Sequence, residues 1–450
     1  MKTPILDFVK AYRKKNAVRL HMPGHKGKMH LGAEPMDITE IAGADELYHA
    51  SGIIRESEQN ATALFGTAQT LYSTEGSSLC IRAMLLLIQR LAASRGEKPR
   101  ILAARNAHKS FLSALALLDI EVEWLFSKGD SLLSCELNLE ELEQKLSEQK
   151  FTALYVTSPD YLGNRADIAH LSALCRKHST LLAVDNAHGA YLKFLQPSLH
   201  PIDLGADICC DSAHKTLPTL TGGAYLHIAK NADPLLAKEA KSALALFAST
   251  SPSYLTLASL DLTNRLLATT LPKKLSVVAA RADKLGQALK DKGFLLIGDE
   301  PIKLTLATKS YGYRGDELAR ILEKHGIVCE FCDPDFVVLM LSSDTTAKDV
   351  KRLKKTLTAL PKRPPICEAP PAAPRSVAAL SPREAMLTAS EQTPLDKAVG
   401  KILASPSVGC PPAIPILISG EIISAEAVKC FAYYGMESCL TVKEQKESSL

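Results

Sequence analysis

Short apolar runs alternate with amphipathic stretches between residues 60 and 230 of this chain. Residues 151–157, 181–184 and 206–210 are nearly continuous apolar runs, and their length and composition predict buried strands. Residues 78–93 instead place apolar side chains at helical spacing, interrupted by arginines and a glutamine. Buried strands separated by helices are typical of a mainly parallel sheet that is covered on both faces. We therefore predict an α/β fold for this part of the chain.

The rest of the chain divides into further segments by pattern. Residues 261–290 have a mostly helical pattern, and strand and helix patterns mix again from 294 to 360, which indicates a smaller second domain. Residues 361–374 contain six prolines, a composition that favours an extended connector. We predict an N-terminal segment, a large domain, a small α/β domain, a proline-rich linker and a C-terminal subdomain, at residues 1–30, 31–268, 269–360, 361–380 and 381–450.

Composition and charge make several classes of partner unexpected. The 450 residues carry a formal net charge of only +4 and no dense Lys/Arg block, so neither nucleic acid nor a membrane surface is an expected partner. No apolar stretch reaches the roughly 18 residues of a membrane span, and charges interrupt the apolar residues at the N-terminus, unlike a secretory signal. The 11 cysteines are irregularly spaced, which favours buried free thiols. We expect a cytoplasmic protein without a metal site.

Five polar residues follow candidate strands of the predicted sheet: His108, Tyr161, Asp185, His188 and Lys215. In open parallel sheets, ligands bind beyond the carboxyl ends of the strands. We therefore expect these side chains to line one site.

Lys215 and Asp185 suit one particular cofactor chemistry. Lys215 lies in Asp-Ser-Ala-His-Lys-Thr, thirty positions after Asp185, and a lysine amine can condense with an aldehyde. Asp185 follows four apolar residues, where a carboxylate is costly to bury without a cationic partner such as a protonated ring nitrogen. A Schiff-base lysine and an acidic partner for the ring nitrogen are what a protein must supply to use pyridoxal phosphate. Taken singly, each residue has an ordinary alternative, a surface lysine and a turn-capping aspartate.

A phosphate-binding turn is predicted just before the helical stretch that begins near residue 78. Gly76, Ser77 and Ser78 occupy this position, and the free N–H groups and hydroxyls of a helix N-terminus bind phosphate. Ser212 and His214 are neighbours of Lys215 in sequence and are candidates for further phosphate contacts. Serine-rich helix caps are common, so this prediction depends on the presence of Lys215.

Histidines supply two further predicted contacts. His108 is a solvated loop residue by default, but at a strand end its flat ring can stack on a planar cofactor. His188, in Asn-Ala-His-Gly, is expected close to the face that carries Asp185. Residues 21–27 are dense in His, Gly and Pro and predict a rigid turn near the entrance of the site.

Together these motifs resemble the short form of the bacterial ornithine/lysine/arginine (Orn/Lys/Arg) decarboxylase family, over nearly the whole chain. The motifs that carry the resemblance are His21-Met-Pro-Gly-His-Lys-Gly27, Gly76-Ser77-Ser78, Arg105-Asn-Ala-His-Lys-Ser110, Asp185-Asn-Ala-His-Gly-Ala190, Ser212-Ala-His-Lys-Thr-Leu-Pro218, Thr250-Ser-Pro-Ser-Tyr254 and Pro411-Pro-Ala-Ile-Pro415. The resemblance implies the aminotransferase-like fold type I, with a mainly parallel seven-stranded sheet in the large domain and a smaller α+β C-terminal domain.

The resemblance also implies roles for individual residues. Lys215 would carry pyridoxal 5'-phosphate, Asp185 would pair with its ring nitrogen, and His108 would stack on the ring. The residues implied to hold the phosphate are Ser77, Ser78, Ser212 and His214. The loop with Ser249 and Ser251 would reach the phosphate of the neighbouring subunit, which implies a homodimer with active sites at the subunit interface.

The chain departs from the family pattern at several positions. Glu75 stands where asparagine is usual before the phosphate turn, and Ile81 replaces a second asparagine. Gly409-Cys410 replaces a common tyrosine before the paired prolines, and residues 401–405 differ from the frequent Arg-Ile-Ser-Ala-Glu. These positions border the phosphate turn and the substrate pocket, so they bear on the choice of substrate.

The resulting hypothesis is decarboxylation of a basic amino acid (lysine, arginine or ornithine) to CO₂ and an amine of the kind used in polyamine biosynthesis. Lys215 and His214 are the candidate acids that return a proton to the α-carbon. Glu421 and Glu330 are candidates for binding the distal cation of the substrate. Two alternatives stay open: another reaction on the same cofactor, such as transamination with Arg314 holding the substrate carboxylate, and a non-catalytic scaffold.

Overall fold

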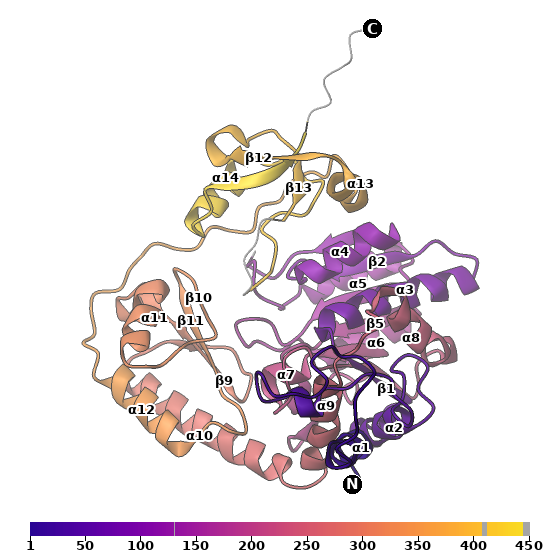
Figure 1. Ribbon diagram of the computed structural model, residues 1–450. Helices are drawn as coiled ribbons and strands as arrows, with labels where there is room; N and C mark the ends of the chain where they lie inside the picture. The colour runs from indigo at the N-terminus through magenta and orange to yellow at the C-terminus, as the bar shows by residue number, and fades with distance from the viewer. Residues whose placement is uncertain (130, 407–411, 444–450) are drawn as a thin grey trace.

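The large sheet of the computed structural model, which describes residues 1–129, 131–406 and 412–443, has seven strands (Figure 1). In spatial order the strands are β1 (Gln69–Ser73), β7 (Ala224–Ile228), β6 (Ile208–Asp211), β5 (Leu181–Asp185), β4 (Ala153–Thr157), β2 (Arg100–Ala104) and β3 (Glu121–Leu125). β7 is antiparallel to both of its neighbours, and the other pairs are parallel. The prediction of an α/β fold with a mainly parallel seven-stranded sheet is confirmed.

Helices cover both faces of this sheet because its central strands are apolar on both sides. In β5, Ala183 packs against one helical layer, whereas Leu182 and Val184 pack against the other. The first layer contains α3 (Gly76–Ser94), α4 (Lys109–Leu118) and α8 (Pro234–Phe247), and the second contains α5 (Leu139–Glu148) and α6 (Ile168–Lys177).

Among the described residues, α3 is the one helix that is long and apolar enough to cross a membrane, although we expected no stretch of that length. Of its apolar window, 61% is buried inside the protein. The helix packs against α4 and α8 on the large sheet, so its apolar surface belongs to the core.

Three helices pack together near β1: α1 (Pro4–Lys14), α2 (Ile53–Phe65) and α9 (Tyr254–Leu267). The carboxylate of Asp261 joins them, because it accepts hydrogen bonds from Leu6 N at 3.0 Å and from Ser57 Oγ at 2.6 Å. The short helix η1 (Glu34–Met36) lies between α1 and α2, and η2 (Ala190–Phe194) and α7 (Ala213–Thr216) lie in connections of the large sheet.

A second, antiparallel sheet follows the long helix α10 (Leu271–Lys292). Its strands, in spatial order, are β10 (Phe331–Cys332), β11 (Phe336–Met340), β9 (Lys303–Ala307) and β8 (Leu296–Ile297). The remaining helices of this region are η3 (Thr308–Tyr311), α11 (Gly315–Lys324) and α12 (Ala347–Thr358), and α12 packs against α10.

The C-terminal region begins after residues 361–377, which hold no helix or strand and run along the outside of the molecule (Figure 1). Its elements are α13 (Pro382–Leu387), β12 (Ser390–Pro394), η4 (Leu395–Lys397), β13 (Leu403–Ser405), α14 (Ala425–Tyr433) and β14 (Ser438–Val442). α13 packs on α4, one of the helices that cover the large sheet. Arg383 donates a hydrogen bond to the carbonyl of Ala116 at 2.9 Å. The proposed division into five segments remains a prediction.

Candidate active site

A cavity of about 560 Å³ lies at the carboxyl ends of the parallel strands. It is lined by nearly all the residues that the sequence singled out: Gly76, Ser77, Ser78, His108, Tyr161, Asp185, His188, Ser212, His214 and Lys215. Ser249 and Ser251 do not line it within one chain, and neither do residues 21–27. The five polar residues expected to converge at strand ends therefore all line this cavity.

Lys215 extends from α7, the single turn that directly follows β6. Its Nζ lies 3.0 Å from Nε2 of His188. His188 follows β5, which is the neighbour of β6 in the sheet. The lysine and the histidine therefore come together at the ends of two adjacent strands.

Asp185 ends β5 and is 1% exposed. Ala187 N donates to its Oδ1 at 3.2 Å, and the hydroxyl of Tyr155 donates to its Oδ2 at 3.4 Å. Burial raises the pKa of Asp185, and the nearby charge of Lys215 offsets only part of this effect. A buried carboxylate is costly without a cationic partner, so this position suits a cationic ligand.

His108 caps the N-terminus of α4. Its Nδ1 accepts hydrogen bonds from Ser110 N at 3.1 Å and from Ser110 Oγ at 2.9 Å, which fixes the ring at the cavity wall. Burial, together with the charges of Lys215 and Lys109, lowers the pKa of His108 to about 4. The ring is therefore neutral at neutral pH, and its flat face can stack on a planar cofactor.

At the N-terminus of α3, the hydroxyls of Ser77 and Ser78 meet hydroxyls from two other segments. Ser212 Oγ donates to Ser77 Oγ at 2.8 Å, and the hydroxyls of Ser78 and Ser110 lie 2.7 Å apart. The turn is closed by Gly76 N, which donates to the carbonyl of Gly222 at 2.7 Å. Hydroxyls and N–H groups at a helix N-terminus form a suitable site for phosphate.

Glu75 connects this turn to the loop with the predicted inter-subunit contacts. Its Oε1 accepts a hydrogen bond from Ser249 N at 2.9 Å, and Ser251 N donates to Ser249 Oγ at 3.1 Å. The loop thus lies beside the phosphate turn of its own chain. Its contact with a neighbouring subunit stays a prediction.

The candidates for binding the distal cation have partners within the chain. Glu421 forms a buried ion pair with Arg105 at 3.1 Å and does not line the cavity. Glu330 accepts a hydrogen bond at 2.8 Å from the hydroxyl of Tyr161, which does line it. Arg314, considered for an aminotransferase, is paired with Asp316 and Glu368 outside the cavity. Gly409, Cys410 and Pro411 lie outside the described residues.

Several cavity residues were not predicted. Asn106 is buried at the wall, and neither its Oδ1 nor its Nδ2 has a hydrogen-bond partner among the described residues, which suits contact with a ligand. Met386 comes from the C-terminal region, and no local sequence signal indicates its place at the cavity. Ser405 and Ile414 come from the same region and lie in the segments 401–405 and 411–415, which the comparison with the family pattern had singled out. Asn106, by contrast, lies within the quoted motif 105–110 and could have been included.

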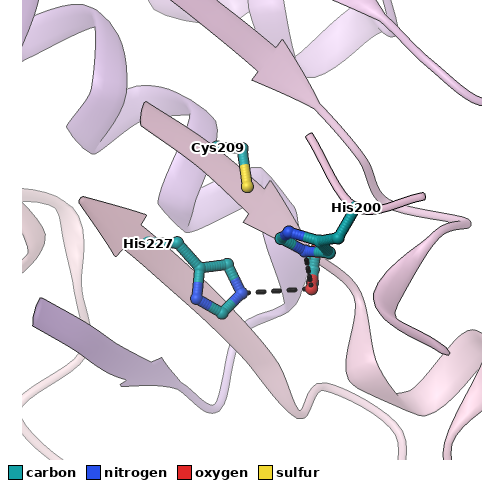
Figure 2. Close-up of side chains that lie close together, drawn as sticks. His200, Cys209 and His227 are labelled. Carbon is teal, nitrogen blue, oxygen red and sulfur yellow. Dashed lines mark hydrogen bonds and ion pairs between the residues drawn. The ribbon is translucent and has the colours of Figure 1, made fainter. Parts of the chain in front are cut away.

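A buried histidine cluster lies on the other face of β6. Figure 2 shows His200 and His227 directed at one oxygen, Oδ2 of Asp211, and each Nε2 lies 3.1 Å from it. With Cys209, the four side chains place potential metal ligands within 4.8 Å of one another.

Hydrogen bonding favours a structural role for this cluster over metal binding. Ile202 N donates to His200 Nδ1 at 3.3 Å, so the proton of this ring is on Nε2, which donates to Asp211 and has no lone pair for a metal. Burial acts to raise the pKa of Asp211, but the two histidines hold it well below its usual range. Asn186 also donates to Asp211, at 2.6 Å, and so joins the segments that carry Asp185 and Lys215.

Comparison with known proteins decides the family. Residues 3–292 match the family described as Orn/Lys/Arg decarboxylase, major domain. The chain belongs to the Orn/Lys/Arg decarboxylase family. This confirms the resemblance stated from the motifs and supports the prediction of a decarboxylase.

Similar proteins and solved structures match this chain over most of its length. It is 30% identical to the arginine decarboxylase of Halalkalibacterium halodurans over 94% of this chain and 91% of that protein. It is 28% identical to the arginine decarboxylase of Bacillus subtilis, over 100% and 96%. The lysine decarboxylase A of Pseudomonas aeruginosa shares its fold, with a TM-score of 0.78 and 17% identity over 98% of this chain and 80% of that one.

Proposed function

We propose that this protein uses pyridoxal 5'-phosphate to decarboxylate a basic amino acid, with arginine as the first substrate to test. The observation that supports it most is the cavity where Lys215, Asp185 and His108 meet a hydroxyl-rich helix N-terminus. Arginine comes first because similar proteins over nearly the full chain are named arginine decarboxylases.

The residues present fit this cofactor. The buried carboxylate of Asp185 would meet the protonated ring nitrogen, and Ser77, Ser78 and Ser212 would hold the phosphate. The neutral ring of His108 would lie against the cofactor ring, and Lys215 would condense with the aldehyde. When bound, pyridoxal phosphate accepts the electron pair that the departing CO₂ leaves behind.

The return of a proton to the α-carbon falls to Lys215 or His214. Nδ1 of His214 donates to the carbonyl of Gly223 at 3.0 Å, because a carbonyl oxygen only accepts. Burial lowers the pKa of His214, so the neutral ring presents a bare Nε2, which takes up a proton instead of giving one. We therefore propose Lys215, in its protonated form, as the proton donor.

Product analysis tests this function. Purified protein with pyridoxal phosphate is incubated with arginine, lysine or ornithine carrying a labelled carboxyl carbon. We expect labelled CO₂ and the matching amine from one of them, and no product from Lys215→Ala. A keto acid as the product would indicate transamination, and the absence of both product and cofactor binding would indicate a scaffold.

We also propose a homodimer. The segment 18–31 exposes Val18, Leu20, Met22, Met29 and Leu31, of which Leu31 is 95% exposed. Large apolar side chains gathered on one segment favour burial against another surface. A dimer is expected in sedimentation velocity at micromolar concentration, and a monomer at all concentrations would contradict it.

The described cysteines are all free, which supports the proposed cytoplasmic location.

A further inference from the structure

His188 lies between two lysines. Its Nε2 is 3.0 Å from Nζ of Lys215, and its Nδ1 is 3.4 Å from Nζ of Lys303. Lys303 begins β9 of the second sheet and therefore comes from a different region than the catalytic lysine. No local sequence pattern connects Lys303 to the site.

Lys303 is held as a buried cation. Its side chain is 1% exposed and forms an ion pair at 2.5 Å with Glu300, which is 0% exposed. The ammonium also donates to the carbonyl of Asp160 at 3.3 Å. The hydroxyl of Tyr191 donates to the other carboxylate oxygen of Glu300 at 3.3 Å. Each charge of this pair therefore has partners that fix its position.

This cation determines the tautomer of His188. An ammonium has no lone pair and can only donate, so Nδ1 of His188 must accept and the ring proton must be on Nε2. Burial, together with the charge of Lys303, lowers the pKa of His188 well below its usual value, so the ring stays neutral. The Nε2–H group faces Lys215, whose Nζ can accept this hydrogen bond only as a neutral amine.

We propose that Lys303 and Glu300 are positioning residues that hold His188 in its Nε2–H form and thereby present Lys215 to the cofactor aldehyde as a neutral amine. The proposal rests on the proposed function. The neutral amine attacks the aldehyde carbon, a water molecule leaves, and a C=N bond replaces C=O. A protonated Lys215 finds no acceptor at His188, so the same arrangement makes it a stronger acid toward the substrate.

Other charged groups that face Lys215 act in both directions. Asp185 on β5 favours the ammonium form of Lys215, because opposite charges attract. His108 at the start of α4 and His214 on α7 are neutral, with lowered pKa values. The pair of Lys303 and Glu300 must therefore act chiefly through the His188 hydrogen bond, since its own two charges nearly cancel at a distance.

The test removes both charges together. Lys303→Met alone would leave Glu300 buried and unpaired and would endanger folding. In Lys303→Met/Glu300→Gln, the amide oxygen still accepts from Tyr191. The matched control is Lys241→Met/Glu58→Gln, because this Lys–Glu pair, at 2.6 Å and partly buried, lies outside the cavity.

The first measurement is the rate at which the apoprotein forms the imine absorbance band with pyridoxal 5'-phosphate, as a function of pH. We expect the midpoint of this profile to rise by about one pH unit in the double variant, which is roughly a tenfold slower capture below the midpoint. The rate at high pH should be nearly unchanged, and the control should follow the wild type. An unchanged midpoint in Lys303→Met/Glu300→Gln would overturn the proposal.

The second measurement is the ¹⁵N chemical shifts of His188 in the apoprotein, which distinguish the two neutral tautomers. The wild type should show Nε2–H, and the double variant should lose that preference. An Nδ1–H form in the wild type would overturn the proposal even if the enzyme is active. If the protein binds no pyridoxal phosphate, the proposed function fails, and the tautomer still decides this inference.

Discussion

At the scale of single residues, the site is built from groups whose protonation is set by burial. His108 and His188 have lowered pKa values because their rings are desolvated and lie near lysines. Asp185 has a raised pKa for the same primary reason, burial. A cofactor with a cationic ring nitrogen would stabilise the buried carboxylate.

The lowered pKa of His108 predicts a pH dependence of stability in the apoprotein. An unfolded histidine binds a proton near pH 6.5, whereas folded His108 does so only at about pH 4. Between these values the unfolded state binds more protons, so stability falls as the pH is lowered from 6.5 toward 4. His108→Asn keeps an N-cap acceptor but cannot titrate. Compared with this variant, the wild type should lose about 1–2 kcal/mol more between pH 7.5 and pH 5 in urea unfolding.

The His108 prediction has a direct spectroscopic check. In proton NMR, the ring signal of His108 should not titrate between pH 5 and pH 8. A midpoint near pH 6.5 would show that the ring is solvated and would contradict both the pKa and the proposed stacking role.

The cluster around Asp211 predicts a large cost for Asp211→Asn. The carboxylate accepts from His200, His227 and Asn186, and an amide cannot accept on both sides. We expect a loss of about 3 kcal/mol in the free energy of unfolding, measured in urea at pH 7. Asp344→Asn, at an exposed pair with Lys274, should cost less than about 0.5 kcal/mol. Stabilisation of the wild type by Zn²⁺ that Asp211→Asn abolishes would favour the metal interpretation instead.

At the scale of elements, apolar runs predicted the central strands within two residues. The predicted strand at 151–157 is β4, and the one at 206–210 is β6. β1 and β7 escaped prediction because they carry polar residues in buried positions. Thr70 and His227 are hydrogen-bonded to each other at 2.9 Å across this strand pair, and only the folded register shows that their burial is satisfied.

The phosphate turn depends on a glycine that no single-sequence pattern identified as essential. Gly222 has a φ of +92°, and an added Cβ would lie 2.4 Å from the carbonyl oxygen of Thr74. Gly222→Ala should therefore displace the turn, break its hydrogen bond with Gly76, and weaken pyridoxal-phosphate binding by roughly tenfold or more. Binding is measured by titration of the apoprotein.

Gly400→Ala serves as the control for backbone strain alone. Gly400 has a φ of +84°, but an added Cβ would meet nothing within 4 Å. This variant should lose about 1 kcal/mol of stability and bind the cofactor as the wild type does. Equal binding by both alanine variants would show that the turn tolerates displacement.

At the scale of the whole molecule, the C-terminal region completes a site that the sequence placed in the large domain. The motif residues at strand ends were predictable because parallel strands end at one edge of a sheet. The contributions of Lys303 and Met386 were not, because they depend on how separate regions pack. Contacts between residues that lie far apart along the chain leave no periodic signal in the sequence.

A buried ion pair joins the C-terminal region to the segment that follows β2, and its removal tests this contact. Arg105 donates to Glu421 at 3.1 Å and to the carbonyl of Ile416 at 3.2 Å, and both side chains are less than 10% exposed. Arg105→Met leaves Glu421 unpaired and should destabilise the contact by about 3–5 kcal/mol, whereas Arg105→Met/Glu421→Leu should recover part of this loss. Limited proteolysis within residues 361–380 measures how far the C-terminal region is released from the rest of the protein. A detached C-terminal region would expose this connector on both sides and speed its cleavage. Equal cleavage of the wild type and Arg105→Met would mean that other contacts, such as α13 on α4, hold the region in place.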